Sequence, residues 1–274
     1  MKYIFSLGAG LAAICSLPAQ AHDAWIEAYP SEAGEPSPAH IELLIGHAED
    51  RETYLPPRAH LSRIATLSES GMVSQMQSYE VFAGQARIPI SPVSPTEDAV
   101  ITISTFRAKS MLPAKKFNDY VAEEGITPIA DIREERGQAE KEGREVYARH
   151  MKAMVTDLTG DCDLSFLSMP VGDPLEILPT SHPGAGCGDA LSFRVLFMGQ
   201  ALEGATLHLN RTDAPMTPIK AQTDETGEAV FDRPDAGRWY VHAAWAQPVS
   251  EDRYGADFAT SFASLSFELA DIAD

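Results

Sequence analysis

Short segments in which apolar and polar residues alternate, bounded by turn-forming residues, dominate this chain. Between residues 23 and 106 they include HIELLIGH, QARIPISP and AVITISTFRA, separated by clusters such as SEAGEPSP and SPVSPTED. The pattern returns after Ala190 in LSFRVLFMG, ATLHLNR and GRWYVHAAW. A period of two is typical of half-buried strands, and many short strands with turns between them favour a β-sandwich. We therefore predict a mainly β fold, with one β-sandwich over residues 22–112 and a second over residues 189–270.

The period of the apolar residues changes between these two regions. Gly125 interrupts the new pattern, and Thr127-Pro128 has the composition of a helix start. We predict a short helical insert over residues 113–158. The apolar residues at helical spacing are Phe117, Tyr120 and Val121, then Ile129 and Ile132, then Val146, Tyr147, His150, Met151 and Met154. We interpret the last group as core and not as a site for a soft metal, because methionine at this spacing is typical of packing.

The first 21 residues have the composition of a secretory signal peptide. Lys2 precedes a weakly flanked apolar run, and Ala19-Gln20-Ala21 has the small-x-small pattern of a cleavage site. The apolar run is shorter than the roughly 20 residues that a membrane span requires. We expect cleavage between Ala21 and His22, so that the mature chain begins with His22, is exported to the periplasm and does not insert into the membrane.

Charge and cysteine usage narrow the classes of function. The formal net charge of −19 argues against nucleic acid and anionic membranes as partners. Cys162 and Cys187 are the two cysteines that follow the signal segment, and an even pair in an exported chain predicts a disulfide. This disulfide would close the loop-rich segment that we predict over residues 159–188. Neither cysteine belongs to a Cys-x-x-Cys pair of the kind that holds zinc.

The spacing of His22 and His47 predicts that these two residues meet. If HDAWIEAY and HIELLIGH form an antiparallel hairpin centred between Gly34 and Glu35, paired residues have index numbers that sum to 69, as 22 and 47 do. Residues paired in this way have Cβ atoms about 4.5–5.5 Å apart. Both histidines would then stand at the open end of an apolar face.

Two imidazoles and a terminal amine form a nitrogen-rich set that suits Cu²⁺ or Ni²⁺. We therefore expect a transition-metal site with His22 and His47 as primary ligands. The candidate additional ligands are Asp23, Glu49 and His60. The alternative is that His22 is only the first residue of the chain and His47 a loop residue. We expect His242 to be a half-buried strand residue, and His40, His182 and His208 to be surface or strand positions.

The second β region resembles the prealbumin-like and carboxypeptidase-regulatory-like sandwich modules. The resemblance rests on LSFRVLFMGQALEGATLHL followed by TDETGEAVFDRPDAGRWYVHA. Together with AHDAWIEAYP, IGHAED and FNDYVAEEG, the chain resembles over residues 19–269 the NikM-like family of exported proteins with a domain of unknown function. That resemblance implies Ig-like or prealbumin-like domains and a periplasmic component of cobalt or nickel uptake, with a membrane metal transporter as partner.

No sequence motif of a hydrolase is present, and we expect the chain not to be an enzyme. It has neither a Gly-x-Ser-x-Gly elbow nor a His-Glu-x-x-His pair. We predict a periplasmic protein that binds Ni²⁺, Co²⁺ or Cu²⁺ for metal uptake or handling. Two alternatives remain: a binding, adhesion or spacer module without a metal, and a copper-dependent oxidative enzyme with an N-terminal histidine site. The second requires a flat aromatic face, whereas Trp25, Trp239 and Trp245 all lie in predicted strands.

Overall fold

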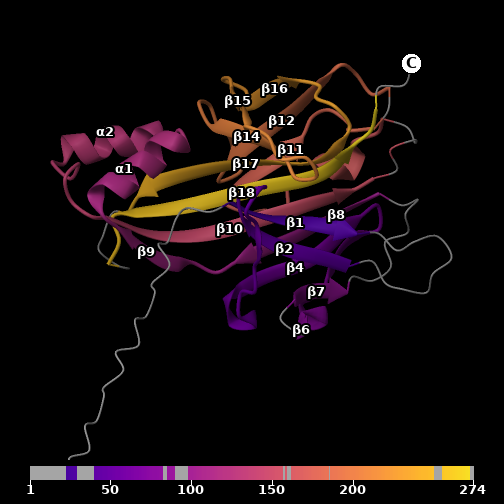
Figure 1. The fold of residues 1–274 in the computed structure, drawn as a ribbon, viewed down its shortest axis with the longest axis horizontal. Coiled ribbons are helices and arrows are strands. Elements are labelled where there is room, and N and C mark those ends of the chain that lie inside the picture. The colour runs from indigo at the N-terminus through magenta and orange to yellow at the C-terminus, as the bar shows by residue number, and fades with distance from the viewer. Residues whose placement is uncertain are drawn as a thin grey trace, which may run out of the picture.

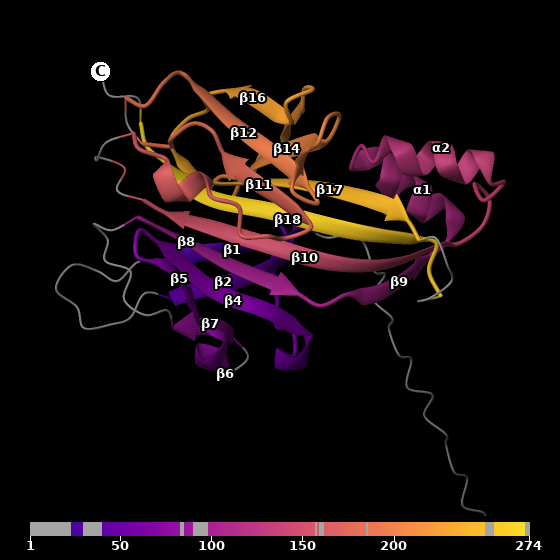
Figure 2. The ribbon, with the colours of Figure 1, turned by 180° about the vertical axis from the view of Figure 1, so that it is seen from behind.

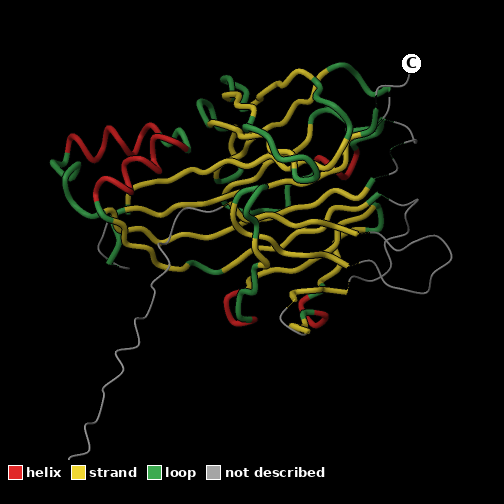
Figure 3. Tube along the Cα trace, in the orientation of Figure 1, coloured by secondary structure: helices red, strands yellow, loops and turns green. Residues whose placement is uncertain are grey.

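Three β-sheets and a helical hairpin make up the fold of the computed structural model (Figure 1, Figure 3). The structure describes residues 23–29, 40–82, 85–89, 98–156, 158, 162–184, 186–249 and 255–271. The largest sheet, here called the central sheet, runs in the order β15-β14-β17-β18-β10-β8-β4-β5, and β9 also pairs with β10. Its strands are β4 (Leu61–Ser68), β5 (Gly71–Ser74), β8 (Ala99–Thr105), β9 (Ala108–Leu112), β10 (Gly143–Val155), β14 (Thr206–Arg211), β15 (Ile219–Gln222), β17 (Gly237–Pro248) and β18 (Phe258–Leu269).

Two smaller sheets pack on opposite faces of the central sheet (Figure 1, Figure 2). The N-terminal sheet contains β1 (Asp23–Tyr29), β2 (His40–Gly46), β3 (Glu52–Thr53), β6 (Glu80–Phe82) and β7 (Gln85–Pro89). The C-terminal sheet contains β11 (Leu175–Pro179), β12 (Ala190–Phe197), β13 (Gln200–Ala201) and β16 (Glu228–Asp232). Three short 3₁₀ helices, η1 (Arg58–His60), η2 (Met76–Ser78) and η3 (Ser165–Ser168), lie in the connections.

Alternation along the central strands divides the hydrophobic core between the two interfaces. On β10, Met151 and Ala153 pack against the N-terminal sheet, whereas Met154 packs against the C-terminal sheet. Successive strand residues point to opposite faces, so one strand serves both cores. The mainly β sandwich fold with a short helical insert is confirmed. The two predicted sandwiches share the central sheet, because β8 of the first and β18 of the second both hydrogen-bond to β10.

The helical hairpin consists of α1 (Ala114–Glu123) and α2 (Thr127–Glu135), at one end of the long strands β17 and β18 (Figure 1). Phe117 and Ile129 pack with Ala244 and Phe258 in a separate apolar cluster. Gly143 lets α1 approach closely, because a Cβ at this position would lie 2.0 Å from the Phe117 ring. Neither helix has the length and apolar composition that crossing a membrane requires.

The prediction of helix after residue 142 is wrong. Residues Gly143–Val155, which include His150, Met151 and Met154, form strand β10. Nearly every position of β10 is buried, because sheets cover both faces of the strand at its centre. A strand buried on both faces carries apolar residues without alternation, so residues at i, i+3 and i+4 coincide with a helical pattern.

Two sequence predictions of local connection are confirmed. Strands β1 and β2 form an antiparallel pair in which Asp23 lies opposite Gly46 and Ala24 opposite Ile45, the register with an index sum of 69. Cys162 and Cys187 form a disulfide.

A buried ion pair joins the C-terminal sheet to the central sheet. Glu176 of β11 accepts a hydrogen bond from Lys152 Nζ at 2.6 Å, and also accepts the backbone N–H groups of Val171, Gly172 and Asp173. Lys152 is 4% exposed and Glu176 is 2% exposed. The carboxylate therefore holds both β10 and the loop that precedes β11.

The two halves of this ion pair differ in what their loss leaves behind. Glu176→Leu leaves a buried ammonium and three backbone N–H groups without their acceptor, so we expect the free energy of unfolding to fall by about 3–5 kcal/mol. Lys152→Met leaves the carboxylate with three donors, and we expect a fall of about 1.5–3 kcal/mol. Urea unfolding followed by fluorescence measures both. A larger loss in Lys152→Met than in Glu176→Leu would contradict this interpretation.

Candidate metal centre

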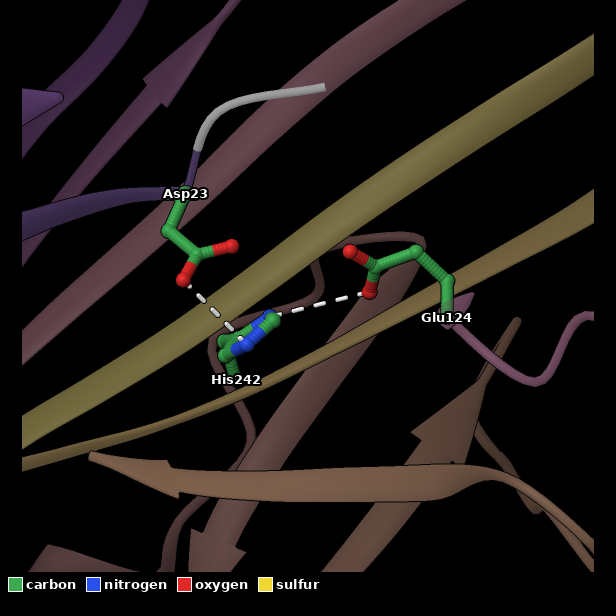
Figure 4. A group of neighbouring side chains, drawn as sticks. All are labelled: Asp23, Glu124 and His242. Carbon is green, nitrogen blue, oxygen red and sulfur yellow. Dashed lines mark ion pairs between the residues drawn. The ribbon is translucent and has the colours of Figure 1, made fainter. Parts of the chain in front are cut away.

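Three side chains from distant parts of the chain meet on one face of the central sheet (Figure 4). His242 of β17 places Nε2 3.3 Å from Asp23 Oδ2 and Nδ1 3.7 Å from Glu124 Oε2. One donor atom from each of the three residues lies within 4.8 Å of the other two, and all three residues are buried. Ligands that share an ion with bonds of about 2.0–2.2 Å lie about 3–4 Å apart, so the three donor atoms would move closer together to bind one ion.

A second histidine lies beside this cluster. Strands β14 and β17 pair in a register that places His208 opposite His242, and the centroids of the two rings are 4.6 Å apart. His208 is only 4% exposed, yet its Nε2 has no hydrogen-bond partner among the described residues. Leaving a buried polar group unpaired costs about 1–3 kcal/mol. A ligand bound at this point would satisfy that atom.

Strand β1 reaches the cluster because its free edge lies on the central sheet. Ser264 Oγ donates to the carbonyl oxygen of Ala24 at 2.7 Å, and Ser266 Oγ donates to the carbonyl oxygen of Ile26. With its backbone edge against β18, β1 directs Ala24 and Ile26 into the core of the N-terminal sheet. Alternation along a strand then sends the odd-numbered side chains to the other side.

The odd-numbered side chains of β1 contact β17. Tyr240 donates its hydroxyl hydrogen to Asp23 Oδ2 at 2.9 Å. The rings of Trp25 and Tyr240 are stacked, with centroids 4.5 Å apart and planes 4° from parallel. Both aromatic side chains have no exposed surface. Asp23 is thus held in place by strand β1 and by its hydrogen bond from Tyr240, which lies two residues before His242 on β17.

Glu124 is positioned by the turn at the end of α1. It is the C-cap residue of that helix, and Gly125 follows with φ of +68°. A Cβ at Gly125 would lie 2.1 Å from Thr206 Oγ1 of β14. Only glycine combines this left-handed conformation with such a close approach. The turn therefore rests directly on the strand that carries His208.

The cluster opens into a cavity of about 220 Å³ between β1, the helical hairpin and strands β14 and β17. Polar and charged side chains form most of its lining. The residues that line it are Asp23, His47, Leu112, Lys116, Asp119, Tyr120, Glu123, Glu124, His208, Asn210, Pro218 and His242.

Burial controls the protonation of these groups. Burial raises the pKa of Glu124 well above its ordinary value, and the negative charges of Asp23 and Glu123 act in the same direction. Burial lowers the pKa of His208 to about 3, with the neighbouring His242 as the next cause. It also lowers the pKa of His242 to about 3, and the positive charge of His47 adds to this effect. Both imidazoles are neutral at pH 7 and can donate a lone pair to a metal.

The structure brings together two of the residues that the sequence singled out as ligands. Asp23 and His47 both line the cavity, whereas Glu49 and His60 do not. His60 is exposed in η1, on a connection outside the cavity. His22 and the cleavage site at Ala21 lie outside the described residues.

Sequence reasoning missed Glu124 and His242, which belong to the cluster, and His208, which lies beside it. His242 lies in strand β17 as predicted, but it is 6% exposed and so buried where a half-buried residue was expected, and it belongs to the cluster. His208 and His242 both interrupt apolar strand segments, and this was the available signal. Their pairing depends on the contact between β14 and β17, which are separated by β15 and β16 along the chain.

The chain matches the family described as Domain of unknown function (DUF4198) over residues 19–247. This protein belongs to that family. The match spans β1, α1 and the part of β17 that carries His242, so it includes every residue of the cluster. A comparison with curated proteins found no match.

Gly125 offers a test of how the site is positioned. We expect Gly125→Ala to lower the free energy of unfolding by more than the roughly 1–2 kcal/mol of a left-handed alanine, because the new Cβ collides with Thr206. The matched control is Gly137→Ala, where φ is +60° and nothing lies within 4 Å of the new Cβ. Urea unfolding compares the two variants. Equal losses would show that the contact with Thr206 imposes no constraint.

The low pKa of His208 predicts how stability depends on pH. A histidine whose pKa falls from 6.5 in the unfolded chain to about 3 binds its proton more readily when unfolded, so it removes stability as pH falls below 6.5. Between pH 6.5 and about pH 5 this amounts to about 2 kcal/mol. His208→Leu removes the part of the loss that His208 contributes and leaves the part that comes from His242, whereas His60→Gln, at an exposed histidine, leaves the whole loss in place. Unfolding midpoints measured across this range would contradict the assignment if both variants behaved as the parent.

Proposed function

We propose that this chain binds one divalent transition-metal ion, nickel, cobalt or copper, in the cluster of Asp23, Glu124 and His242. The observation that carries the proposal is the convergence of three buried donor atoms within 4.8 Å, beside an unpartnered His208 Nε2, in a cavity. Buried charged and polar groups without full partners are costly in a folded protein. An ion would offset that cost by accepting lone pairs from all of them.

The donor set selects a class of metal. Imidazole nitrogen suits nickel, copper and zinc, whereas sites built from carboxylates alone suit magnesium, calcium and manganese. A set with two carboxylates and one or two imidazoles therefore suits a transition-metal ion, and geometry and metal availability decide among nickel, cobalt and copper. Glu124 would bind as the ionised carboxylate, the form that an ion favours and that burial disfavours by raising the pKa of this group.

The mature N-terminus would contribute further nitrogen donors. His22 directly precedes Asp23 of the cluster in the sequence, and the Cα atoms of adjacent residues are about 3.8 Å apart. We infer that cleavage after Ala21 frees an amine beside this cavity, where His47 also lies. The amine or imidazole of His22, or the imidazole of His47, would take one further position on the ion beside the cluster.

The biological role that fits this site is metal uptake or handling in the periplasm, with a membrane transporter as partner. Support comes from the composition of residues 1–21, the resemblance to exported components of nickel and cobalt uptake and the one cluster of converging donors among the described residues. One site of this kind suits delivery of an ion better than storage. A non-metal spacer would have no use for three buried metal-ligating side chains that converge from separate elements.

Metal titration tests the proposal. Protein that begins at His22 is titrated with Ni²⁺, Co²⁺, Cu²⁺ and Zn²⁺ by calorimetry, and we expect one ion per chain. His242→Ala should weaken binding of the preferred ion by at least about tenfold. The matched control is His60→Ala, since His60 is exposed and does not line the cavity. Equal affinities in His242→Ala and the parent would contradict the assignment of the cluster.

The role of the terminal amine needs a separate comparison. Protein with one alanine added before His22 keeps the imidazoles of His22 and His47, but its terminal amine belongs to the added alanine and not to His22. We expect its affinity to fall by at least about tenfold, which is about 1.4 kcal/mol. Retained affinity in this variant, with loss in His242→Ala, would restrict the site to the side chains of the cluster.

A further inference from the structure

The cavity is far larger than a metal ion requires. A single water molecule requires roughly 10–15 Å³ of such space, whereas the cavity measures about 220 Å³. The three donors of the cluster lie within 4.8 Å of one another, so an ion between them would fill only a small part of this space. An ion held there would face the remaining space with its open coordination positions.

The wall that helix α1 forms carries charges that a bare ion would not use. Lys116, Tyr120 and Glu123 follow one another at intervals of four and three residues, which places them on one face of α1, and all three line the cavity. Asp119 also lines the cavity, and its carboxylate is paired with Lys115 at 2.6 Å. This wall therefore presents an ammonium at one end and a carboxylate at the other.

We propose, building on the proposed metal site, that the cavity takes the metal together with a small amino-acid chelator. Nickel and cobalt with nitrogen and oxygen donors take up to about six ligands, so three or four protein donors leave room for a bidentate molecule. An α-amino acid chelates through its amine nitrogen and one carboxylate oxygen. Its second carboxylate oxygen can accept a hydrogen bond from Lys116, and its metal-bound amine still has N–H groups to donate to Glu123.

The sign of the charges selects this class over a polycarboxylate. Asp23, Asp119, Glu123 and Glu124 all line the cavity, whereas Lys116 is the one basic side chain in its lining other than histidine. A chelator with several carboxylates would be repelled by this surface. An amino acid adds one carboxylate, and its single negative charge is balanced by the ammonium of Lys116.

Equilibrium dialysis with radiolabelled glycine tests the proposal, using protein that begins at His22. We expect about one glycine per chain in the presence of equimolar Ni²⁺, and none without the metal or when citrate replaces glycine as the labelled probe. Lys116→Met should weaken glycine retention by about tenfold, as for the loss of one charge-assisted hydrogen bond. Its affinity for Ni²⁺ alone should change by less than about twofold. The matched control is Lys109→Met, at an exposed lysine of β9 that does not line the cavity.

The outcomes separate this inference from the proposed function. Binding of Ni²⁺ without retention of glycine would overturn the chelator and leave the metal site intact. Retention of glycine without metal, or retention of citrate in place of glycine, would also overturn it. If the protein binds no metal in the parallel calorimetric titration, the proposed function itself fails and the chelator fails with it.

Discussion

The contact between the edge of β1 and the central sheet is the constraint on which the site depends. The hydroxyl groups of Ser264 and Ser266 bond to backbone oxygens of β1, where a neighbouring strand would otherwise supply N–H groups. This edge-on contact turns Asp23 toward β17 while Ala24 remains in the core. An ordinary face-to-face packing of two sheets would bury one face of β1 and expose the other. Here both faces are buried, and one of them carries a carboxylate.

The helical hairpin supplies the second half of the site. It packs through its own apolar cluster on β17 and β18, and Gly125 allows its turn to touch β14. Glu124 is therefore held by contacts that are independent of those that hold Asp23. Two carboxylates from separate elements converge on one imidazole, and burial raises the pKa of Glu124 well above its ordinary value. Such an arrangement stabilises the fold less than an apolar core would, which is consistent with a role in binding.

The sequence predicted the strands, the hairpin register and the disulfide because each is local. The register of β1 and β2 follows from one turn centre, so Asp23 opposite Gly46 could be derived by counting. The sequence also directed attention to Asp23 and His47. The predicted register, however, placed the primary metal ligands on the face of β1 that carries Ala24. No local sequence pattern reveals that β1 packs on the central sheet by its edge. Glu124 and His242 are 118 residues apart and meet only through the packing of α1 against β17. The helix predicted around His150 failed for a related reason, because burial on both faces of β10 removes the alternation that identifies a strand.

Anomalous diffraction from crystals of the nickel-loaded protein, recorded at the nickel absorption edge, tests the central claim most directly. The account predicts one anomalous peak in the cavity, about 2.0–2.2 Å from a nitrogen of His242 and from carboxylate oxygens of Asp23 and Glu124. A fully occupied nickel site elsewhere on the chain, with no peak between these three residues, would contradict it.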